Sequence, residues 1–548
     1  MNLINTIINK VIASLKEEFK LSSDQLQTIQ ISINVDKDKE FGDLNCNCAM
    51  VLAKPLGEPP RKIAERAKEA LLAKAAKYVE SVEVAGPGFI NIHLHNKTWE
   101  TIAKEISTLG GDFFKPELKN PKKYLLEFVS ANPTGPLHLG HGRNGIIGDV
   151  LTNVLRFLGH TADKEFYIND AGSQIGKLGI SLKIRCQQLL GEEVELPEDG
   201  YAGEYLIELA KTCVEHYGDK IIEESDSFFA DYAKEQLLER IKRTLDSYGI
   251  RFDRWFSELR LHKDGSIEKA IDSLHKKELA YEKDGAIWFK ATEFGDDKDR
   301  VIKKSDDTYT YIAADIAYHE DKFKRGYDKL INILGQDHHG YVKRLKGTMS
   351  ALGYDSDDLE VILYQLVSLK QSGKQIKMSK RAGKFETLSD IIEKVGADVA
   401  RFFYLNRKAD AHLDFDLDIA LRKTEENPVY YIQYAYVRTN SLLEKAKDNG
   451  LTPSSDNVII SSPEIKIIKK ICSLEPILTS IGKSYQTHML AYYTLELAKH
   501  FHTYYASNRI VDTENKETSQ SRLFIVKIVQ QTLALCLDLL GLDKPKNM

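Results

Sequence analysis

Two histidines stand at the point where the sequence changes from a strand pattern to a helix pattern. His138 and His141 belong to the segment 130–143, which follows the apolar run 124–129 and contains prolines and glycines that interrupt regular structure. Apolar residues then recur at helical spacing over 146–158. The first turn of such a helix has unbonded N–H groups and a partial positive charge, both of which favour phosphate. Glycines around the two histidines would let a phosphate or a flat ring approach the backbone.

A second segment of possible chemical importance lies late in the chain. Lys377 and Lys380 flank Met378 and Ser379, shortly after the turn-forming pair 372–373. Taken singly, the first segment fits a helix-capping turn with solvated imidazoles equally well, and the second fits an exposed basic loop. The order and the separation of the two segments carry more information than either segment alone.

Together the two segments resemble the paired signature motifs of class I aminoacyl-tRNA synthetases, His-x-Gly-His early in the chain and Lys-Met-Ser-Lys late. The longer context resembles the arginyl-tRNA synthetase family over nearly the whole chain, through the segments 130–143, 167–172, 337–342, 380–383 and 427–435. The resemblance implies activation of L-arginine with ATP to arginyl-adenylate and pyrophosphate. Arginine is then transferred to the 2′-OH of the terminal ribose of tRNA(Arg).

The resemblance also implies roles in activation for residues at matching positions. His138 and His141 are expected to donate hydrogen bonds to phosphate oxygens, and Lys377 and Lys380 to close over the β- and γ-phosphates with Mg²⁺. Both reactants are anionic, so positive charge and hydrogen-bond donors are what the transition state requires. The sequence shows no convincing nucleophile with a paired base. The further residues expected at the ATP site are Pro136, Leu137, Leu139, Gly140, Gly142, Met378 and Ser379.

Arginine recognition requires carboxylates that match a planar guanidinium. By resemblance, Asp315 pairs with the guanidinium and Tyr311 packs beside it; four residues apart, they share one face of a helix. Glu127 and Asn132 are expected to hold the α-amino group. The alternative is that Asp315 pairs with a structural lysine and that Tyr311 belongs to the core. Further arginine-binding candidates are Ser130, Gln336 and Asp337.

The elements that position these residues predict a multidomain α/β protein. Strand and helix patterns alternate over 120–424, as in a Rossmann-like doubly wound parallel sheet, with strands expected at 124–129, 161–168, 330–334 and 359–363. A mainly helical insertion is expected at about 175–300. Residues 1–110 are expected to form a small α/β N-terminal domain, which in the family contacts tRNA; from the sequence alone it could equally be an inert packing module.

Residues 425–548 read as an all-α bundle, which binds the anticodon in the family. Long helices are expected at 428–443, 465–481, 489–507 and 521–540. Tyr430, Tyr434 and Arg438 are candidates for tRNA binding, since aromatic rings stack on unpaired bases. The alternative is that the tyrosines belong to the core and its rim.

Composition limits the other possibilities. The chain has 548 residues, 42% hydrophobic and 29% charged, which is typical of globular proteins with several domains. No apolar run approaches the roughly 20 residues of a membrane helix, and the start lacks a signal-peptide pattern. A cytoplasmic monomer that does not bind membranes is therefore expected. The net charge of −5 means that an RNA partner must use local basic surface.

The six cysteines predict no metal site. Cys46 and Cys48 are too close for the usual zinc pair, and no second pair complements them. Rival functions are a class I synthetase for another amino acid, a small nucleotidyltransferase of the same superfamily, and an inactive tRNA-binding protein. A cysteinyl enzyme would need a zinc-binding cysteine set, and a nucleotidyltransferase would need neither this length nor the bundle.

Overall fold

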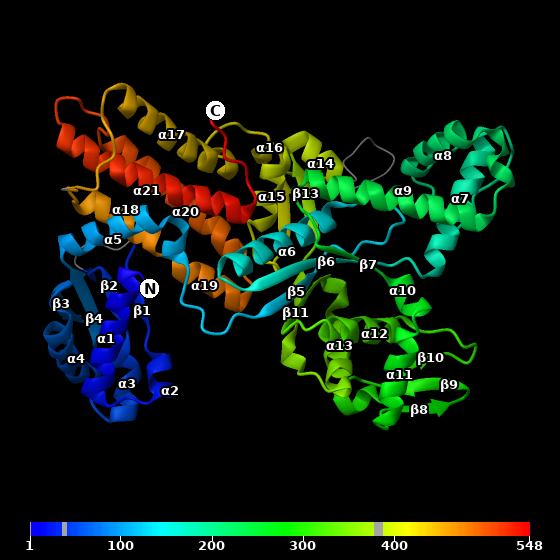
Figure 1. The fold of residues 1–548 in the computed structure, drawn as a ribbon, viewed down its shortest axis with the longest axis horizontal. Helices are drawn as coiled ribbons and strands as arrows, with labels where there is room; N and C mark the ends of the chain where they lie inside the picture. The colour runs from blue at the N-terminus through cyan, green and yellow to red at the C-terminus, as the bar shows by residue number, and fades with distance from the viewer. Residues whose placement is uncertain (1, 36–40, 377–386, 457) are drawn as a thin grey trace. The chain divides into compact units, whose positions relative to one another are not determined.

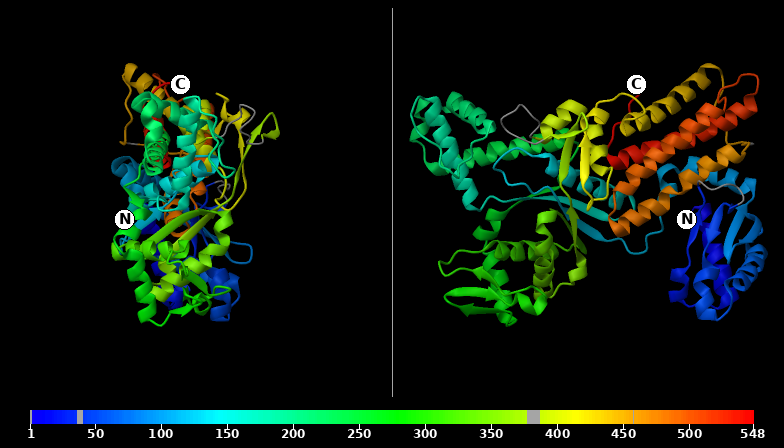
Figure 2. Two further views of the ribbon diagram at one scale, coloured as in Figure 1. Left: turned by 90° about the vertical axis from the view of Figure 1, so that its right-hand side faces the viewer. Right: turned by 180° about the vertical axis from the view of Figure 1, so that it is seen from behind.

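The computed structural model describes residues 2–35, 41–376, 387–456 and 458–548, which divide into two compact units. The first unit combines the chain up to Lys119 with 423–484 and 489–548, so it contains both ends of the chain. The second combines 120–422 with 485–488 and contains the early histidine motif. Figures 1 and 2 show the elements from three directions.

The N-terminal part of the first unit is a small α/β fold. Its four strands form an antiparallel sheet in the order β1-β2-β4-β3. Asn2 caps the first helix. Its side chain accepts the N–H of Asn5 and so satisfies one of the free donors of the first turn. The elements are α1 (Leu3–Phe19), α2 (Ser23–Thr28), β1 (Ile31–Ile33), β2 (Leu44–Cys46), α3 (Cys48–Leu56), α4 (Pro60–Ala75), β3 (Val79–Ala85), β4 (Phe89–Leu94) and α5 (Asn96–Leu109).

The second unit is built on a five-stranded parallel sheet in the order β12-β11-β5-β6-β7. Its strands are β5 (Lys123–Glu127), β6 (Thr161–Ile168), β7 (Arg254–Ser257), β11 (Lys329–Gly335) and β12 (Leu359–Tyr364), so four of the five had been predicted. Helix α6 (Leu139–Phe157) covers one face, and α12 (Tyr311–Lys324) and α13 (His339–Leu352) cover the other (Figure 1). The doubly wound fold class is therefore confirmed.

The span expected to be mainly helical, 175–300, is helical up to Ser247 and then combines two shorter helices with strands. Helices α7 (Ser173–Leu189), α8 (Glu204–Tyr217) and α9 (Asp226–Ser247) form an insertion with its own apolar core. After β7 come α10 (Glu258–Lys263), α11 (Ser266–Lys276) and an antiparallel sheet of β8 (Ala280–Lys283), β9 (Ala286–Phe289) and β10 (Arg300–Lys303). Asp284 and Gly285 both have positive φ and turn β8 into β9, which is the role of this dipeptide in tight hairpins.

The second unit ends in a small sheet and short helices. The sheet has the order β14-β13-β15, with β13 (Val367–Gln371), β14 (Lys374–Ile376) and β15 (Leu413–Asp416). The helices are α14 (Leu388–Val395), α15 (Ala397–Leu405) and α16 (Leu417–Ala420). The late motif, with Lys377, Met378, Ser379 and Lys380, falls between β14 and α14 and lies outside the described residues.

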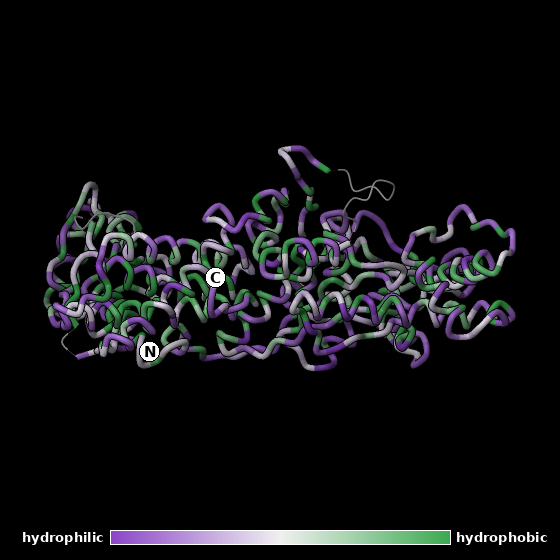
Figure 3. The backbone as a smooth tube through the Cα atoms, turned by 90° about the horizontal axis from the view of Figure 1, so that it is seen from above, coloured by the Kyte–Doolittle hydropathy of each residue, from purple (hydrophilic) through white to green (hydrophobic). Residues whose placement is uncertain are grey.

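The C-terminal part of the first unit is helical, as expected, and polar and apolar residues are interspersed along its helices (Figure 3). Its helices are α17 (Pro428–Asp448), α18 (Ser462–Cys472), α19 (Leu474–Ser484), α20 (His488–Ser507) and α21 (Lys516–Leu540). The single helix predicted over 465–481 was wrong, because a break at Ser473 separates α18 from α19. Pro476 lies in the first turn of α19, where a missing N–H costs nothing, whereas inside a longer helix it would break a hydrogen bond.

One helix among the described residues, α21, is long and apolar enough to cross a membrane by length and composition alone. Of its most apolar window, 67% is buried inside the protein, as in a core helix of a bundle. All six cysteines are buried and free. In the described part of the chain, no group of three or more His, Cys, Asp or Glu side chains is arranged to hold a metal ion.

Candidate active site

The loop between β5 and α6 carries the early motif in an unusual backbone conformation. Val129 and Ser130 have φ values of 65° and 40°, in the left-handed region that side chains other than glycine rarely adopt. The surrounding structure holds them there: the N–H of Val129 donates to Asn144 Oδ1 at 2.7 Å, and Ser130 Oγ donates to Glu127 Oε1 at 3.1 Å. Such strain is found where a structure fixes a functional loop.

The two histidines are neutral donors fixed by the backbone of α6. His138 caps the helix, and its Nδ1 accepts the N–H of Gly140 at 3.1 Å. The Nδ1 of His141 accepts the N–H of His138 at 3.2 Å, and the two rings stack with centroids 3.6 Å apart. Burial lowers the pKa of both, and His138 helps to lower the pKa of His141 to about 3. With each Nδ1 accepting, the proton of each neutral ring lies on Nε2, which is left to donate to a ligand.

Several residues expected at the ATP site also have a packing role. The side chains of Leu137 and Leu139 are 2% and 1% exposed, so only their backbone atoms are available to a ligand. A Cβ on Gly142 would lie 2.7 Å from Leu388 Cδ1, so this glycine permits close packing of α6 on α14. A Cβ on Gly140 would lie 2.9 Å from the His138 ring, so this glycine makes room for the histidine. Pro136 is half-buried in the loop before them.

Asp315 lies on α12 in a buried polar region. The hydroxyl of Tyr341, on α13, donates to Asp315 Oδ2. Burial, helped by the charges of Glu127 and Glu258, raises the pKa of Asp315 to about 7 against the lowering effects of Tyr341 and Lys322. The carboxyl is thus half protonated near neutral pH, and a cation placed beside it would restore its charge.

The tyrosine expected beside Asp315 is not the one that bonds to it. Tyr311 is the first residue of α12 and is 68% exposed, so it is not part of the core. Tyr341 makes the contact instead, from a helix that follows in the sequence. Asp315 does not pair with a structural lysine through any described hydrogen bond or ion pair. Lys322, whose charge lowers the pKa of Asp315, pairs with Glu127 instead.

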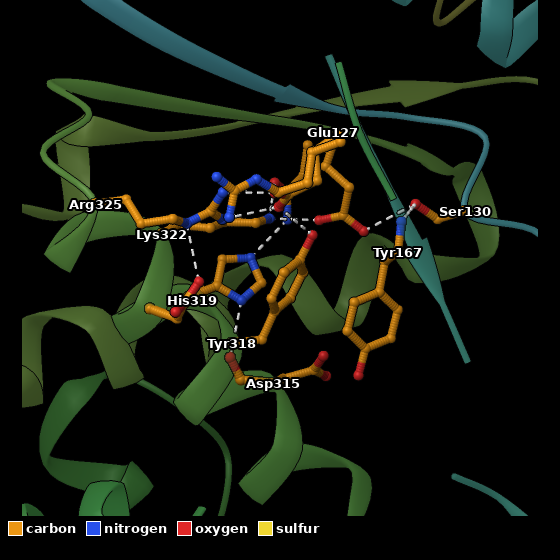
Figure 4. A network of polar contacts seen from close by, with 12 residues as sticks. Glu127, Ser130, Tyr167, Asp315, Tyr318, His319, Lys322 and Arg325 are labelled. Atoms are coloured by element: carbon orange, nitrogen blue, oxygen red, sulfur yellow. Dashed lines mark hydrogen bonds and ion pairs between the residues drawn. The ribbon is translucent and has the colours of Figure 1, made fainter. Parts of the chain in front are cut away.

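A chain of buried contacts connects Glu127 to the backbone of Asp315 (Figure 4). Lys322 Nζ lies 2.5 Å from Glu127 Oε2 and donates to Asn332 Oδ1 at 3.2 Å. His319 then joins Asn332, at 2.7 Å through Nε2, to the carbonyl of Asp315, at 2.9 Å through Nδ1. Glu127 was expected to hold an α-amino group, but its two oxygens already contact Lys322 and Ser130. A further donor would have to share them.

Glu258 is a candidate that the sequence analysis missed. It is 5% exposed, begins α10 directly after β7, and shares a hydrogen bond with Tyr167. Burial raises its pKa, and its charge in turn raises the pKa of Asp315. Its position at the carboxyl end of a parallel strand is where ligands of such sheets bind, and that signal could have identified it. Three carboxyl groups, those of Glu127 on β5, Asp315 on α12 and Glu258 on α10, thus lie in one buried region. In that region Lys322 is paired with Glu127.

Of the remaining arginine candidates, Ser130 joins this region through its hydrogen bond to Glu127, whereas no described contact joins Asn132, Gln336 or Asp337 to it. Asn132 is exposed, and its amide donates to Gln174 Oε1 at 3.0 Å. Gln336 is half-buried at the end of β11, and the side chain of Asp337 is 84% exposed. Ser130 accepts the N–H of Tyr167 at 3.1 Å, which ties the loop to β6.

The bundle holds a separate cluster of tyrosines around an arginine. Arg438 lies over the rings of Tyr434 and Tyr505, with its Cζ 4.3 and 4.4 Å from the two centroids. It also donates to the Tyr434 hydroxyl at 2.5 Å. Tyr430 stacks beside Tyr434, with centroids 6.2 Å apart. These tyrosines are only partly buried, so they are not simply core residues.

Comparison with known proteins decides the family. Residues 2–94 match the family model "Arginyl tRNA synthetase N terminal domain", 106–411 match "tRNA synthetases class I (R), catalytic domain", and 432–548 match "DALR anticodon binding domain". This chain belongs to the arginyl-tRNA synthetases.

Its similarity to other arginyl-tRNA synthetases extends over the whole chain. It is 44% identical to arginine–tRNA ligase 1 of Halalkalibacterium halodurans, covering 95% of this chain and 94% of the relative. It is 42% identical to arginine–tRNA ligase of Bacillus subtilis, covering 97% and 98%. A solved structure described as a putative arginyl-tRNA synthetase from Campylobacter jejuni is 37% identical, with a TM-score of 0.76 over 82% of this chain and 99% of that one. The Thermus thermophilus arginyl-tRNA synthetase, 21% identical with a TM-score of 0.76 over 99% of both, shares the fold.

Proposed function

We propose that this arginyl-tRNA synthetase works as an arginine–tRNA ligase through the buried carboxyl groups beside α12. The reaction joins arginine to AMP from ATP, releases pyrophosphate, and passes arginine to the 2′-OH of the terminal ribose of tRNA(Arg). The observation that carries the proposal is the excess of buried carboxyl groups over cations around Asp315. A guanidinium is the cation that fits such a region, because its planar fork can meet two carboxylates at once.

In this proposal Asp315 and Glu258 hold the guanidinium, and Tyr341 orients the Asp315 carboxyl. Exposed Tyr311 covers the entrance from the start of α12. The α-amino group is held by Glu127, Ser130 and Asn132, since a carboxylate oxygen can accept more than one hydrogen bond. Gln336 and Asp337, at the end of β11, are ranked below these residues.

Activation relies on donors that stabilise negative charge. The arginine carboxylate attacks the α-phosphorus of ATP, and pyrophosphate leaves; no covalent bond to the protein is needed. His138 and His141 donate from Nε2 to phosphate oxygens, and being neutral they need no proton exchange with solvent to do so. Backbone atoms around Pro136, Leu137, Leu139 and Gly140 bound the nucleotide.

The late motif contributes the cationic side of the site. Lys377 and Lys380, next to Met378 and Ser379, are proposed to contact the β- and γ-phosphates, on the strength of the family motif. Mg²⁺ is proposed to arrive with ATP, because it is usually held by phosphate oxygens and water with few protein ligands. The lack of a metal-binding cluster among the described residues is compatible with such a substrate-borne ion.

The bundle is proposed to bind the anticodon end of tRNA(Arg) through Tyr430, Tyr434 and Arg438. Partly buried rings that flank a guanidinium offer flat surfaces on which unpaired bases stack. A cavity of about 480 Å³ lined by Lys466, Lys499 and His500, among others, opens on α18 and α20 and supplies positive charge for the RNA backbone. We assign 1–110 to the N-terminal tRNA-contacting domain, 120–424 to catalysis and 425–548 to anticodon binding, in a cytoplasmic monomer.

Pyrophosphate exchange with each of the twenty amino acids, with and without tRNA, tests the reaction. Arginine should support exchange, and tRNA should be required for it, as in the family. Exchange supported by another amino acid and not by arginine would contradict the proposal.

The RNA surface is tested by the salt dependence of tRNA binding. Lys466→Ala with Lys499→Ala should weaken binding at all sequences and reduce the slope of log affinity against log salt by about 1 for each lost phosphate contact. The matched control is Lys211→Ala with Lys220→Ala, which removes two exposed lysines from the insertion. An unchanged slope in the first double variant would remove this cavity from the RNA surface.

A further inference from the structure

The loop that carries the early motif is held from outside by the helical insertion. Tyr205, the second residue of α8, donates its hydroxyl proton to the carbonyl of Thr134 at 2.6 Å. The ring also lies against Gly135, where a Cβ would be in ordinary van der Waals contact with it at 3.5 Å. Gly203 is required, because a Cβ there would lie 2.3 Å from the same ring. Burial raises the pKa of Tyr205 to about 12, so the hydroxyl remains a donor at every pH at which the enzyme works.

The carbonyl that Tyr205 holds belongs to a tight turn in the loop. The N–H of Thr134 donates to the carbonyl of Asn132 at 2.8 Å, which closes the turn. On its other side, the Asn132 amide donates to Gln174 Oε1, on α7, at 3.0 Å. The two ends of this turn are thus bonded to two helices of the insertion and not to the sheet that precedes it.

The insertion also touches the segment that follows the late motif. Thr244 Oγ1, on α9, lies 3.1 Å from Ser389 Oγ, on α14. The next link is direct, since the N–H of Leu388 donates to the carbonyl of Leu137 in the early motif at 2.8 Å. One helical insertion therefore contacts the flanks of both motifs, and Tyr205 makes the shortest of its bonds to the early one.

We propose that Tyr205 is a positioning residue for arginine activation, holding the Thr134 carbonyl so that Asn132 and the loop before His138 keep the geometry that substrates require. This rests on the proposed function, in which Asn132 binds the α-amino group of arginine. Without the Tyr205 hydroxyl the turn loses its outer anchor while the sheet, α6 and the guanidinium site stay in place. Arginine should then bind less well, and tRNA should bind as before.

The test is Tyr205→Phe, which removes one hydroxyl and leaves the ring packed on Gly135. Its matched control is Tyr201→Phe, a half-buried tyrosine of the same insertion whose hydroxyl makes no described bond to the loop. In tRNA-supported pyrophosphate exchange, Tyr205→Phe should raise the KM for arginine by about 3- to 10-fold, the effect of one neutral hydrogen bond. The KM for tRNA should not change, and Tyr201→Phe should behave as the wild type.

A merely structural role would give a different pattern. Partial unfolding lowers kcat through the fraction of active enzyme and leaves the KM for arginine unchanged, and that result would overturn the proposal. Backbone hydrogen exchange of the peptide 131–138 gives a readout independent of activity. The exchange should accelerate in Tyr205→Phe and not in Tyr201→Phe. This result does not depend on which amino acid the enzyme activates, so it tests the proposal separately from the proposed function. Unchanged exchange in this peptide would also overturn the proposal.

Discussion

Both units place tyrosines at a proposed binding site, but the charged group that the protein supplies has the opposite sign in the two sites. In the bundle, the protein itself provides the guanidinium: Arg438 lies over the rings of Tyr434 and Tyr505, and these rings are only partly buried. Beside α12, the protein provides carboxyl groups and Tyr341, and we propose that the ligand brings the cation. The first arrangement is complete without RNA, whereas the second is complete only when its ligand is bound.

This difference in burial teaches how selective each site can be. A buried carboxyl without its cation is costly, so a wrong amino acid leaves an unpaired polar group and is strongly rejected. A partly exposed ring stacks on any base with similar strength, so the bundle gains affinity from stacking and little discrimination from it. Changes beside α12 should therefore have much larger effects than changes in the bundle.

The largest effect should come from removing the charge of Asp315. Asp315→Asn keeps the size of the side chain and should raise the KM for arginine by roughly 10⁴, because sites built around a buried polar partner discriminate at that level. ATP binding should barely change. Glu320→Gln, the same chemical change on the same helix in a surface pair with Lys324, is the control and should leave the KM for arginine unaltered. A normal KM in Asp315→Asn would remove Asp315 from the pocket.

The second-largest effect should come from the early motif, whose proposed ligand is phosphate and not a guanidinium. His141→Ala should slow adenylate formation by about 10²–10³, the range for the loss of one donor to a transition state. Single-turnover formation of arginyl-adenylate measures this, and His412→Ala, which removes an exposed histidine of the same unit, is the control. If kcat is retained and only thermal stability falls, His141 serves packing alone.

A smaller effect is expected where the protein supplies the guanidinium. Tyr434→Ala should weaken tRNA binding by about 1–3 kcal/mol if the ring stacks on a base, with no change in the KM for arginine. Tyr434→Phe retains the ring and loses only the hydroxyl to which Arg438 donates, so it should retain most of the affinity. A lower melting temperature with unaltered tRNA affinity in Tyr434→Ala would place this ring in the core.

The smallest effect should be a dependence of arginine binding on pH. The pKa of Asp315 is raised to about 7, and its charged form, which binds the guanidinium, predominates above that value. Arginine should therefore bind about tenfold more weakly at pH 6 than at pH 8, since only about a tenth of Asp315 is ionised at pH 6. His141, with a pKa of about 3, is neutral throughout and contributes nothing. Calorimetry on the wild type across this range measures the effect, and an arginine affinity that does not change with pH would contradict this role of Asp315.

Much of the fold could be predicted because its signals are local. The strand at 161–168 was located to the residue, and the histidine motif marked the turn from β5 to α6. The hairpin from β8 to β9 was missed, although Asp284 and Gly285 are a typical hairpin-turn pair, because the long helices dominate the sequence pattern of this span. The break between α18 and α19 was missed because apolar spacing continues through it.

The candidate site was harder to predict because its contacts join distant segments. The spacing of Tyr311 and Asp315 correctly placed them on one helix, but spacing cannot tell that Tyr341, 26 residues beyond Asp315, makes the hydrogen bond. Similarly, no local pattern pairs Glu127 with Lys322, 195 residues later, or adds Glu258 to the same region. Which carboxyl groups remain without a lysine depends on the tertiary structure alone.

The order of strands in the central sheet has a consequence for how this enzyme folds during its synthesis on the ribosome. Strand β5 lies between β6, which is made soon after it, and β11, which is made much later. At about 5–20 residues per second, Lys322 is added roughly 10–40 s after Glu127. During that interval the nascent chain has one edge of β5 unpaired, and Glu127 lacks its ion-pair partner Lys322. The central sheet can thus be completed only after synthesis has passed the insertion, and a chain halted before α12 should be a target for chaperones.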